Sequence, residues 1–129
     1  MFATLEILQM SSALARHAGQ RQAIVAQNVA NSDTPAYVPR DLPPFESAFE
    51  TSAHARGQRA TRENHLNGSL HGAELAEPFR SGGAAAPNGN QVSLETEMLK
   101  SVAAKREHDR ALAIYKTALN VLRGSLRKN

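Results

Sequence analysis

The sequence predicts a mainly α-helical protein, in which long N- and C-terminal helices pair as a coiled coil around an irregular, partly β middle segment. All six prolines lie between Pro35 and Pro87, and proline breaks helices because it lacks an N–H and clashes with the preceding turn. Apolar residues recur at helical spacing on both sides of that segment. We therefore expect a helical arm at 1–34, a turn-rich segment at 35–92 and a second helical arm at 93–129, the two arms together forming one coiled-coil domain.

The N-terminal arm carries a narrow stripe of residues that are three or four positions apart and so share one helix face. Serine, alanine and glutamine interrupt the stripe, so this helix is marginal alone and needs a partner to pack against. The stripe consists of Ile7, Ser11, Leu14, Ala18, Gln22, Val25 and Val29.

The C-terminal arm has the stronger helical pattern. Ser93 suits the N-cap, and Glu95 and Glu97 fall in the first turn, where the helix dipole favours anions. A heptad rhythm follows, polar in its middle and rich in leucine at its end. Its positions are Leu94, Met98, Ser101, Lys105, His108, Leu112, Tyr115, Leu119, Leu122 and Leu126.

The middle segment is rich in turn residues. Asn88-Gly89 predicts a type I′ hairpin turn, and we expect short strands within 77–92, with Val92 as a candidate strand residue. For residues 50–75 the composition predicts poor order in the isolated chain.

The sequence contains few residues or motifs that indicate catalysis or metal binding. The chain has no cysteine, which excludes disulfides, a thiolate zinc site and a cysteine nucleophile. Phosphate-binding, dinucleotide-binding and hydrolase motifs are absent, so we expect no enzymatic activity and no cofactor. The histidines lack the spacing of metal ligands, and His108, which falls on the heptad rhythm, is expected to be packed or half-buried. They are His17, His54, His65, His71 and His108.

Charge and hydropathy argue against nucleic-acid-binding and membrane-spanning proteins. The pI is 9.7, but basic and acidic side chains alternate around Lys105–Arg110, which is typical of a solvated helix rather than a nucleic-acid-binding face. No apolar run is long enough to span a membrane, and residues 1–20 lack the pattern of a secretory signal. We therefore expect no nucleic-acid partner, no membrane span and no cleaved signal peptide.

The most specific segment lies where the first helix is expected to end. Asn28 and Asn31 can bond terminal carbonyls or tolerate bent backbone, proline extends the residue before it, and Tyr37 can anchor the exiting chain. The residues that define this signature are Asn28, Ala30, Asn31, Thr34, Pro35 and Tyr37.

This signature resembles that of the flagellar axial proteins of the rod and hook, whose first helix ends in an A-N-x-x-T-P-G-Y pattern; here it runs from Ala30 to Tyr37, with Ala36 in place of the glycine. The preceding 19–29 and the following Arg40-Asp41 narrow the resemblance to the proximal rod. A second match, 89–98, looks like the entry to that family's C-terminal helix. Alanine pays a steric penalty in the positive-φ turn that a glycine allows.

The resemblance implies a structural subunit of the flagellar basal-body rod, which polymerises through paired terminal helices in the periplasm and transmits torque. It implies as partners copies of the chain, other rod proteins, the flagellar type III export apparatus, the basal-body base and components near the peptidoglycan. A cytoplasmic coiled-coil adaptor and a basic nucleic-acid-binding protein stay as alternatives. The expected assembly interface comprises Ile7, Leu14, Ala18, Val25, Val29, Leu94, Met98, Leu112, Tyr115, Leu119, Leu122 and Leu126.

Overall fold

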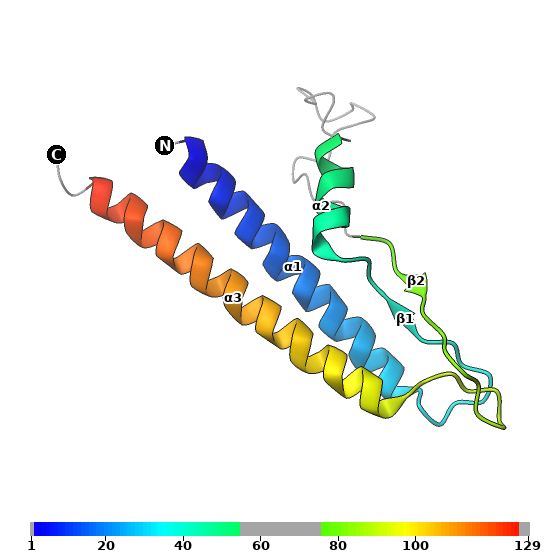
Figure 1. The fold of residues 1–129 in the computed structure, drawn as a ribbon. Helices are drawn as coiled ribbons and strands as arrows, with labels where there is room; N and C mark the ends of the chain where they lie inside the picture. The colour runs from blue at the N-terminus through cyan, green and yellow to red at the C-terminus, as the bar shows by residue number, and fades with distance from the viewer. Residues whose placement is uncertain (1, 55–75, 127–129) are drawn as a thin grey trace, which may run out of the picture.

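The computed structural model describes residues 2–54 and 76–126 (Figure 1). It is mainly helical, with two long terminal helices and a short strand pair between them, which confirms the predicted fold class. In chain order the elements are α1 (Phe2–Ala30), β1 (Arg40–Asp41), α2 (Phe45–His54), β2 (Phe79–Arg80) and α3 (Leu94–Leu126).

Helices α1 and α3 pack side by side and antiparallel, so that the two chain ends lie at the same end of the pair (Figure 1). At ~1.5 Å per residue, their 29 and 33 residues span about 43 and 50 Å. The predicted N-cap of α3 is confirmed, because the Ser93 hydroxyl accepts a hydrogen bond from the Thr96 N–H at 3.4 Å.

Alanines form the seam of α3 that faces α1. Ala104 and Ala111 are completely buried and Ala118 nearly so, each seven residues after the last, and Glu97 continues the same row toward the helix start. We call Ala104, Ala111 and Ala118 the alanine seam. Side chains of this size let helix axes approach closely, and the seven-residue repeat is that of a coiled coil.

On α1, the buried positions include most of the predicted stripe. Ser11, Leu14, Ala18 and Val25 are buried, whereas Ile7 is 41% exposed at the open end of the helix pair. Val29 and Gln22 are half-buried. The sequence therefore identified the packed face of α1 correctly, except at its first turns.

On α3, the leucine-bearing heptad positions do not form the main contact with α1 within the single chain. The packed seam lies one residue earlier in the heptad, because alanines rather than leucines meet α1. Leu119 and Leu122 are half-buried at its flank, and the other large members are exposed. We call these residues the leucine row: Leu94, Met98, Leu112, Tyr115, Leu119, Leu122 and Leu126.

The middle segment forms an antiparallel ribbon beside the helices. Arg40 pairs with Arg80 and Asp41 with Phe79, and the Gln91 N–H bonds the Tyr37 carbonyl at 3.0 Å farther along. The predicted strand region thus holds β2, whereas Val92 lies outside any strand. The prediction of poor order over 50–75 falls mostly outside the described residues.

Helix α2 was not predicted. It starts directly after Pro43-Pro44, where proline's fixed φ suits a helix start. Phe45 packs edge-on against the His17 ring, with centroids 5.7 Å apart, and a His17 ring nitrogen lies 2.9 Å from the Pro43 carbonyl oxygen. These contacts attach the beginning of α2 to the middle of α1.

The turn at Asn88-Gly89 differs from the predicted type I′ geometry, which needs positive φ at both residues. Gly89 has φ of 80°, but Asn88 has no positive φ. The Gly89 N–H bonds the Ala86 carbonyl at 2.8 Å, and the Ala86 N–H bonds the Asn90 carbonyl at 2.7 Å. With Pro87 at its second position, this is a type I turn closed by a glycine bulge.

Replacing Ala111 with leucine should force α1 and α3 apart, because the alanine is completely buried. We expect Ala111→Leu to lower the free energy of unfolding by about 1–3 kcal/mol, as overpacking does, measured by urea denaturation followed by circular dichroism. Ala113→Leu, on the exposed side of the same helix, is the control and should change stability by less than about 0.5 kcal/mol. Equal effects would place the seam elsewhere.

Candidate functional site

Asn28 connects the first helix to both other parts of the fold at their common end. Its side chain is 1% exposed. Nδ2 donates to the Arg40 carbonyl at 2.7 Å and to Glu97 Oε2 at 2.9 Å. Oδ1 accepts from the Arg40 N–H at 3.1 Å and from the Tyr37 hydroxyl at 3.2 Å. One amide thus joins α1, the ribbon and α3.

Glu97 begins a chain of ion pairs that crosses between the same three elements. Its carboxylate is 2% exposed, and Oε1 lies 2.9 Å from Lys100 Nζ. Lys100 Nζ also lies 3.2 Å from Asp41 Oδ2, and Asp41 Oδ1 lies 3.1 Å from Arg21 Nε. We call Arg21, Asn28, Asp41, Glu97 and Lys100 the polar junction.

The junction contains two cations and two anions, so its charges balance. This balance matters because a buried charge without a partner is costly. A further acid, Glu107, approaches Arg21 Nη1 at 3.9 Å. The arrangement fixes both the rotation and the axial position of α3 against α1, since each charge has its partner in one register.

The surroundings shift the pKa of two junction groups. Burial by itself raises the pKa of Asp41, but the Leu42 N–H, Arg21 and Lys100 outweigh it and hold the pKa below its ordinary 3.8. Burial by itself lowers the pKa of Lys100, but hydrogen bonds and charges from Glu97 and Asp41 outweigh it and hold the pKa above 10.5. Both shifts favour the charged forms at neutral pH.

Asn90 fastens the second signature segment to the end of α1. Its buried Nδ2 donates to the carbonyls of Asn31 at 2.9 Å and Thr34 at 2.6 Å, and its Oδ1 accepts from the Val92 N–H at 2.7 Å. Asn31 itself caps α1 by donating from Nδ2 to the Gln27 carbonyl at 2.8 Å. The carbonyls left free by the helix end thus find donors nearby.

Ala36 adopts the conformation that a glycine would occupy more easily. Its φ is 58°, in the left-handed region where a Cβ crowds the following carbonyl. The Ala36 N–H bonds the Asn88 carbonyl at 3.2 Å, and a Cβ on Gly89 would lie 3.4 Å from the Ala36 Cα. Ala36, which stands where the axial-protein signature has glycine, therefore keeps the left-handed turn conformation at a cost in backbone strain.

The signature residues fall into two groups in the structure. Asn28, Asn31, Thr34 and Tyr37 bond one another or their neighbours, and Tyr37 anchors the exiting chain as predicted. Ala30 and Pro35 are exposed. The two segments that the sequence singled out, around residues 28–37 and 89–98, meet at the junction.

Sequence analysis missed most of the junction. Glu97 was interpreted as a partner of the helix dipole. Arg21 and Asp41 entered only through segments that carry the family resemblance, and Lys100 carried no prediction. One signal was present, because Glu97 shares the seven-residue repeat of Ala104, Ala111 and Ala118. An acid on a packed heptad row needs a polar partner across the seam.

No histidine has the spacing of a metal ligand in the sequence, and the described part of the structure can be compared with that expectation. Within the described residues, no group of three or more histidines, aspartates and glutamates is placed to hold a metal ion. His17 is buried against α2, and His108 is half-buried, as predicted. His54 ends α2, and His65 and His71 lie outside the described residues.

No protein-family model matches the chain. Among curated proteins, it is similar to the flagellar basal body rod protein FlgB of Agrobacterium fabrum (strain C58), with 28% identity over 116 residues. The match covers 88% of this chain and 87% of the relative. This similarity confirms the resemblance to the flagellar rod proteins. Because nearly all of both chains is matched, the resemblance to a rod protein extends beyond a single helix.

The polar junction predicts that the free energy of unfolding is highest at intermediate pH and falls at both acid and alkaline pH. Asp41, whose pKa is lowered by folding, stabilises the fold above its unfolded pKa near 3.8 and loses that contribution as the pH falls through its folded value. Lys100, whose pKa is raised, stabilises below 10.5 and loses its contribution as the pH rises through its folded value. Urea denaturation across pH 2–12 measures both losses.

Asp41→Asn tests the loss at acid pH. The change should lower the free energy of unfolding by about 1–3 kcal/mol at neutral pH. It should also reduce the loss of stability at low pH, while the loss at alkaline pH stays the same. Asp109→Asn serves as the control, because Asp109 forms an exposed pair with Lys105 at 3.1 Å and should have little effect. An unchanged loss at acid pH in Asp41→Asn would remove Asp41 from the explanation.

Ala36→Gly should relieve backbone strain. The left-handed conformation costs alanine about 1–2 kcal/mol. Glycine has more conformational entropy in the unfolded chain, which offsets part of the stability gained by relieving this strain. We expect a net gain of about 0.5–1 kcal/mol in the free energy of unfolding. Ala23→Gly, at an exposed position within α1, should instead cost about 1 kcal/mol. A loss of stability in both variants contradicts the strain argument.

Proposed function

We propose that this chain is a structural subunit of the bacterial flagellar basal-body rod. The observation that supports this most is the similarity to FlgB over nearly the whole of both chains. The fold agrees, since paired terminal helices carry a small ribbon at one end. The proposed role is structural and requires neither catalysis nor a cofactor.

Polymerisation through the helices is the mechanism that the exposed side chains support. Leu112 and Tyr115 are 48% and 38% exposed on α3, although they belong to a heptad rhythm. A heptad row that its own chain leaves open fits knobs-into-holes packing with another helix. Burying a leucine is worth ~1.5–3 kcal/mol, so the leucine row can hold a neighbouring subunit. The proposed partners are copies of this chain and other rod proteins.

The proposed place of this assembly is the periplasmic rod, reached through the flagellar type III export apparatus, with the basal-body base and components near the peptidoglycan as further partners. A rod built from many such helix contacts would transmit torque. Among the described helices, none combines the length and apolarity needed to cross a bilayer.

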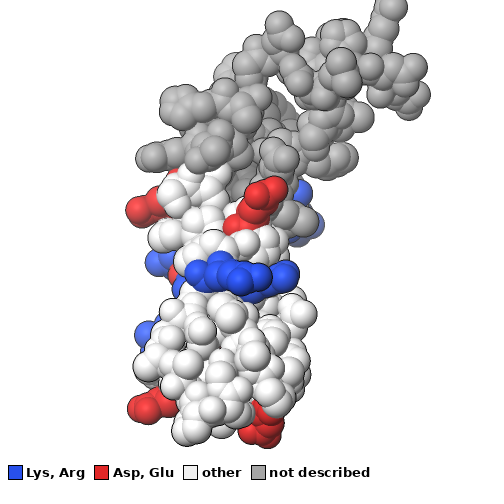
Figure 2. Space-filling model, turned by 90° about the vertical axis from the view of Figure 1, so that its right-hand side faces the viewer, with Lys and Arg blue, Asp and Glu red and all other residues white. Residues whose placement is uncertain are grey.

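A cytoplasmic coiled-coil adaptor or a basic nucleic-acid-binding protein is the alternative. On the side where the ribbon lies, basic side chains form a narrow band across an otherwise mostly uncharged surface (Figure 2). The cross-strand partners Arg40 and Arg80 are both exposed. A nucleic-acid interface would need a broader basic face. The resemblance to a rod protein favours the structural role.

Leu119→Asp and Leu112→Asp test the assembly mechanism. A carboxylate in a packed row is costly when a partner covers it, so both changes should abolish motility and remove the chain from detergent-extracted basal bodies. Export should stay detectable. Leu112 is exposed in the single chain, so Leu112→Asp should leave the helical circular dichroism signal intact. Lys116→Asp, at an exposed position outside the leucine row, is the control; normal swimming by the leucine variants contradicts the interface.

A further inference from the structure

We infer that the outer face of the ribbon is a docking site for a different protein, which presents carboxylates to Arg40 and Arg80. This inference goes beyond the proposed function, because the leucine row belongs to α3 whereas this site belongs to the strands. Three observations carry it: two guanidinium groups face each other across the ribbon, the backbone beneath one of them is fixed by a buried side chain, and neither group has an acidic partner among the described residues.

Arg40 and Arg80 are direct partners across β1 and β2. The Arg40 N–H and carbonyl both bond Asn28 instead of the facing strand, at 3.1 and 2.7 Å, and the neighbouring strand bond joins the Ser81 N–H to the Pro39 carbonyl at 2.9 Å. Arg40 and Arg80 therefore form a non-hydrogen-bonded antiparallel pair, the type in which side chains lie closer together. Their Cβ atoms are then about 5 Å apart.

Both arginines lie on the face of the ribbon that is turned away from the helices. Successive side chains of a strand alternate between its two faces. The Asp41 side chain points to the helices, where it pairs with Arg21 and Lys100, so Arg40 and its cross-strand partner Arg80 lie on the other face. Both are exposed. Figure 2 shows the ribbon side of the molecule, with basic side chains in a band across it.

Neither arginine is neutralised within the described ranges 2–54 and 76–126. The ion pairs found there include neither residue, and Glu77, three residues before Arg80, is exposed and outside those pairs as well. Like charges directly opposite each other in a sheet are destabilising. A cation pair that weakens the ribbon, at a position held by a buried amide, breaks a rule of sheet stability in the way that functional sites do.

The chemistry of the pair selects carboxylates on a protein surface. Each guanidinium presents a planar fork of donors that matches a carboxylate through two parallel hydrogen bonds. A nucleic acid needs a broader basic face, whereas this band is narrow and the surface around it is mostly uncharged (Figure 2). The complement of this site is therefore two neighbouring acids on an otherwise neutral surface.

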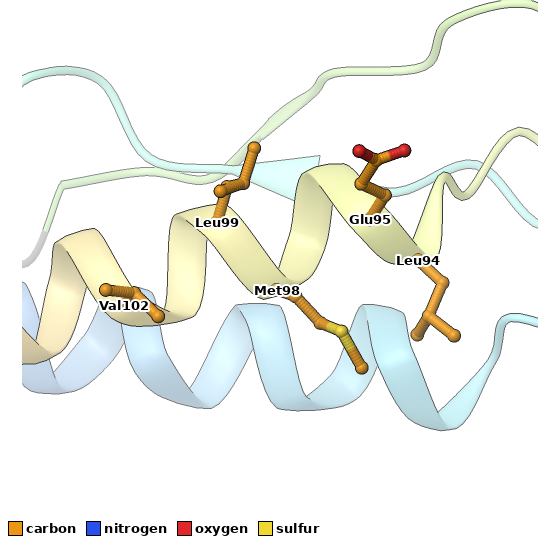
Figure 3. A pocket seen from close by; sticks show the side chains of 5 residues that line it. All are labelled: Leu94, Glu95, Met98, Leu99 and Val102. Atoms are coloured by element: carbon orange, nitrogen blue, oxygen red, sulfur yellow. The ribbon is translucent and has the colours of Figure 1, made fainter.

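The described residues of this chain do not offer that complement to a second copy. Their exposed acids outside ion pairs fall singly on separate segments. Glu95, for example, extends from the first turn of α3 among side chains that carry no charge (Figure 3). The occupant is thus a different protein. The single acids are Glu6, Asp33, Glu46, Glu77 and Glu95.

Zero-length cross-linking tests the contact, because a carbodiimide joins a lysine amine to a carboxylate only where the two touch. Arg80→Lys keeps the positive charge and supplies that amine. The tagged full-length variant replaces the unaltered chain in cells, which are permeabilised and treated, and the products are mapped by mass spectrometry. We expect an amide bond between position 80 and an aspartate or glutamate of a different protein. Arg110→Lys, at an exposed position of α3, is the matched control, and its yield with that protein should be at least tenfold lower.

Two further variants measure the cation pair itself. Arg80→Gln combined with Arg40→Lys should lower the cross-link yield from position 40 at least fivefold relative to Arg40→Lys alone, because one of the two cations is missing. Arg80→Glu converts the like-charge pair to an opposite-charge pair, so the purified chain should unfold at a higher urea concentration than the unaltered chain. A lower urea midpoint contradicts the argument that the pair weakens the ribbon.

The outcomes separate this inference from the proposed function. No cross-link above the Arg110→Lys control, a cross-link to a second copy or to a cell-wall peptide, or binding of a labelled DNA duplex that Arg80→Gln abolishes overturns the docking site. The chain's presence in basal bodies still supports the structural role in each of these cases. A cross-link to a different protein, with the chain absent from basal bodies, supports the docking site and overturns the rod role.

Discussion

The hydrogen bond between Asn28 and Glu97, 2.9 Å long and shielded from water, is the interaction on which the arrangement of the two long helices depends. An alanine seam alone does not define a register, since one alanine fits as well as the next along the helix. A carboxylate and an amide that must meet in a dry site remove that freedom. Lys100, Asp41 and Arg21 then extend the constraint to the ribbon. Specific pairing in this chain thus comes from polar groups, and close approach comes from small apolar ones.

The sequence could predict that two terminal helices exist and that they pair, because the prolines confine the breaks to the middle and the apolar periodicity is helical on both sides. It could not predict which face of α3 is used within the chain. Leu112 and Leu119 dominate any hydropathy pattern, whereas Ala111 and Ala118 contribute little to it, although they occupy the seam. Small residues reach the core by allowing close approach, and a pattern weighted by side-chain size does not show this.

In the middle of the chain, the sequence predicted where turns occur but not their backbone conformation. Turn residues located the bend at Asn88-Gly89, but the turn type depends on Pro87, which sets the preceding φ and leaves only Gly89 in the left-handed region. At Ala36 the tertiary contacts impose a positive φ on a residue that disfavours it. The contacts of three junction residues were missed for a similar reason. Arg21, Asp41 and Lys100 look like ordinary surface charges until the ribbon and α3 are placed against α1.

The position of the polar junction along the helix pair has a mechanical consequence. It fastens α1 to α3 where the ribbon leaves them, whereas the ends at Ile7 and Leu126 are held by a few partly exposed side chains. Two helices that are fixed to each other at one end can move apart or together slightly at the other end by elastic bending. Small changes in the gap between the helices at the open end therefore leave the ion pairs of the polar junction intact.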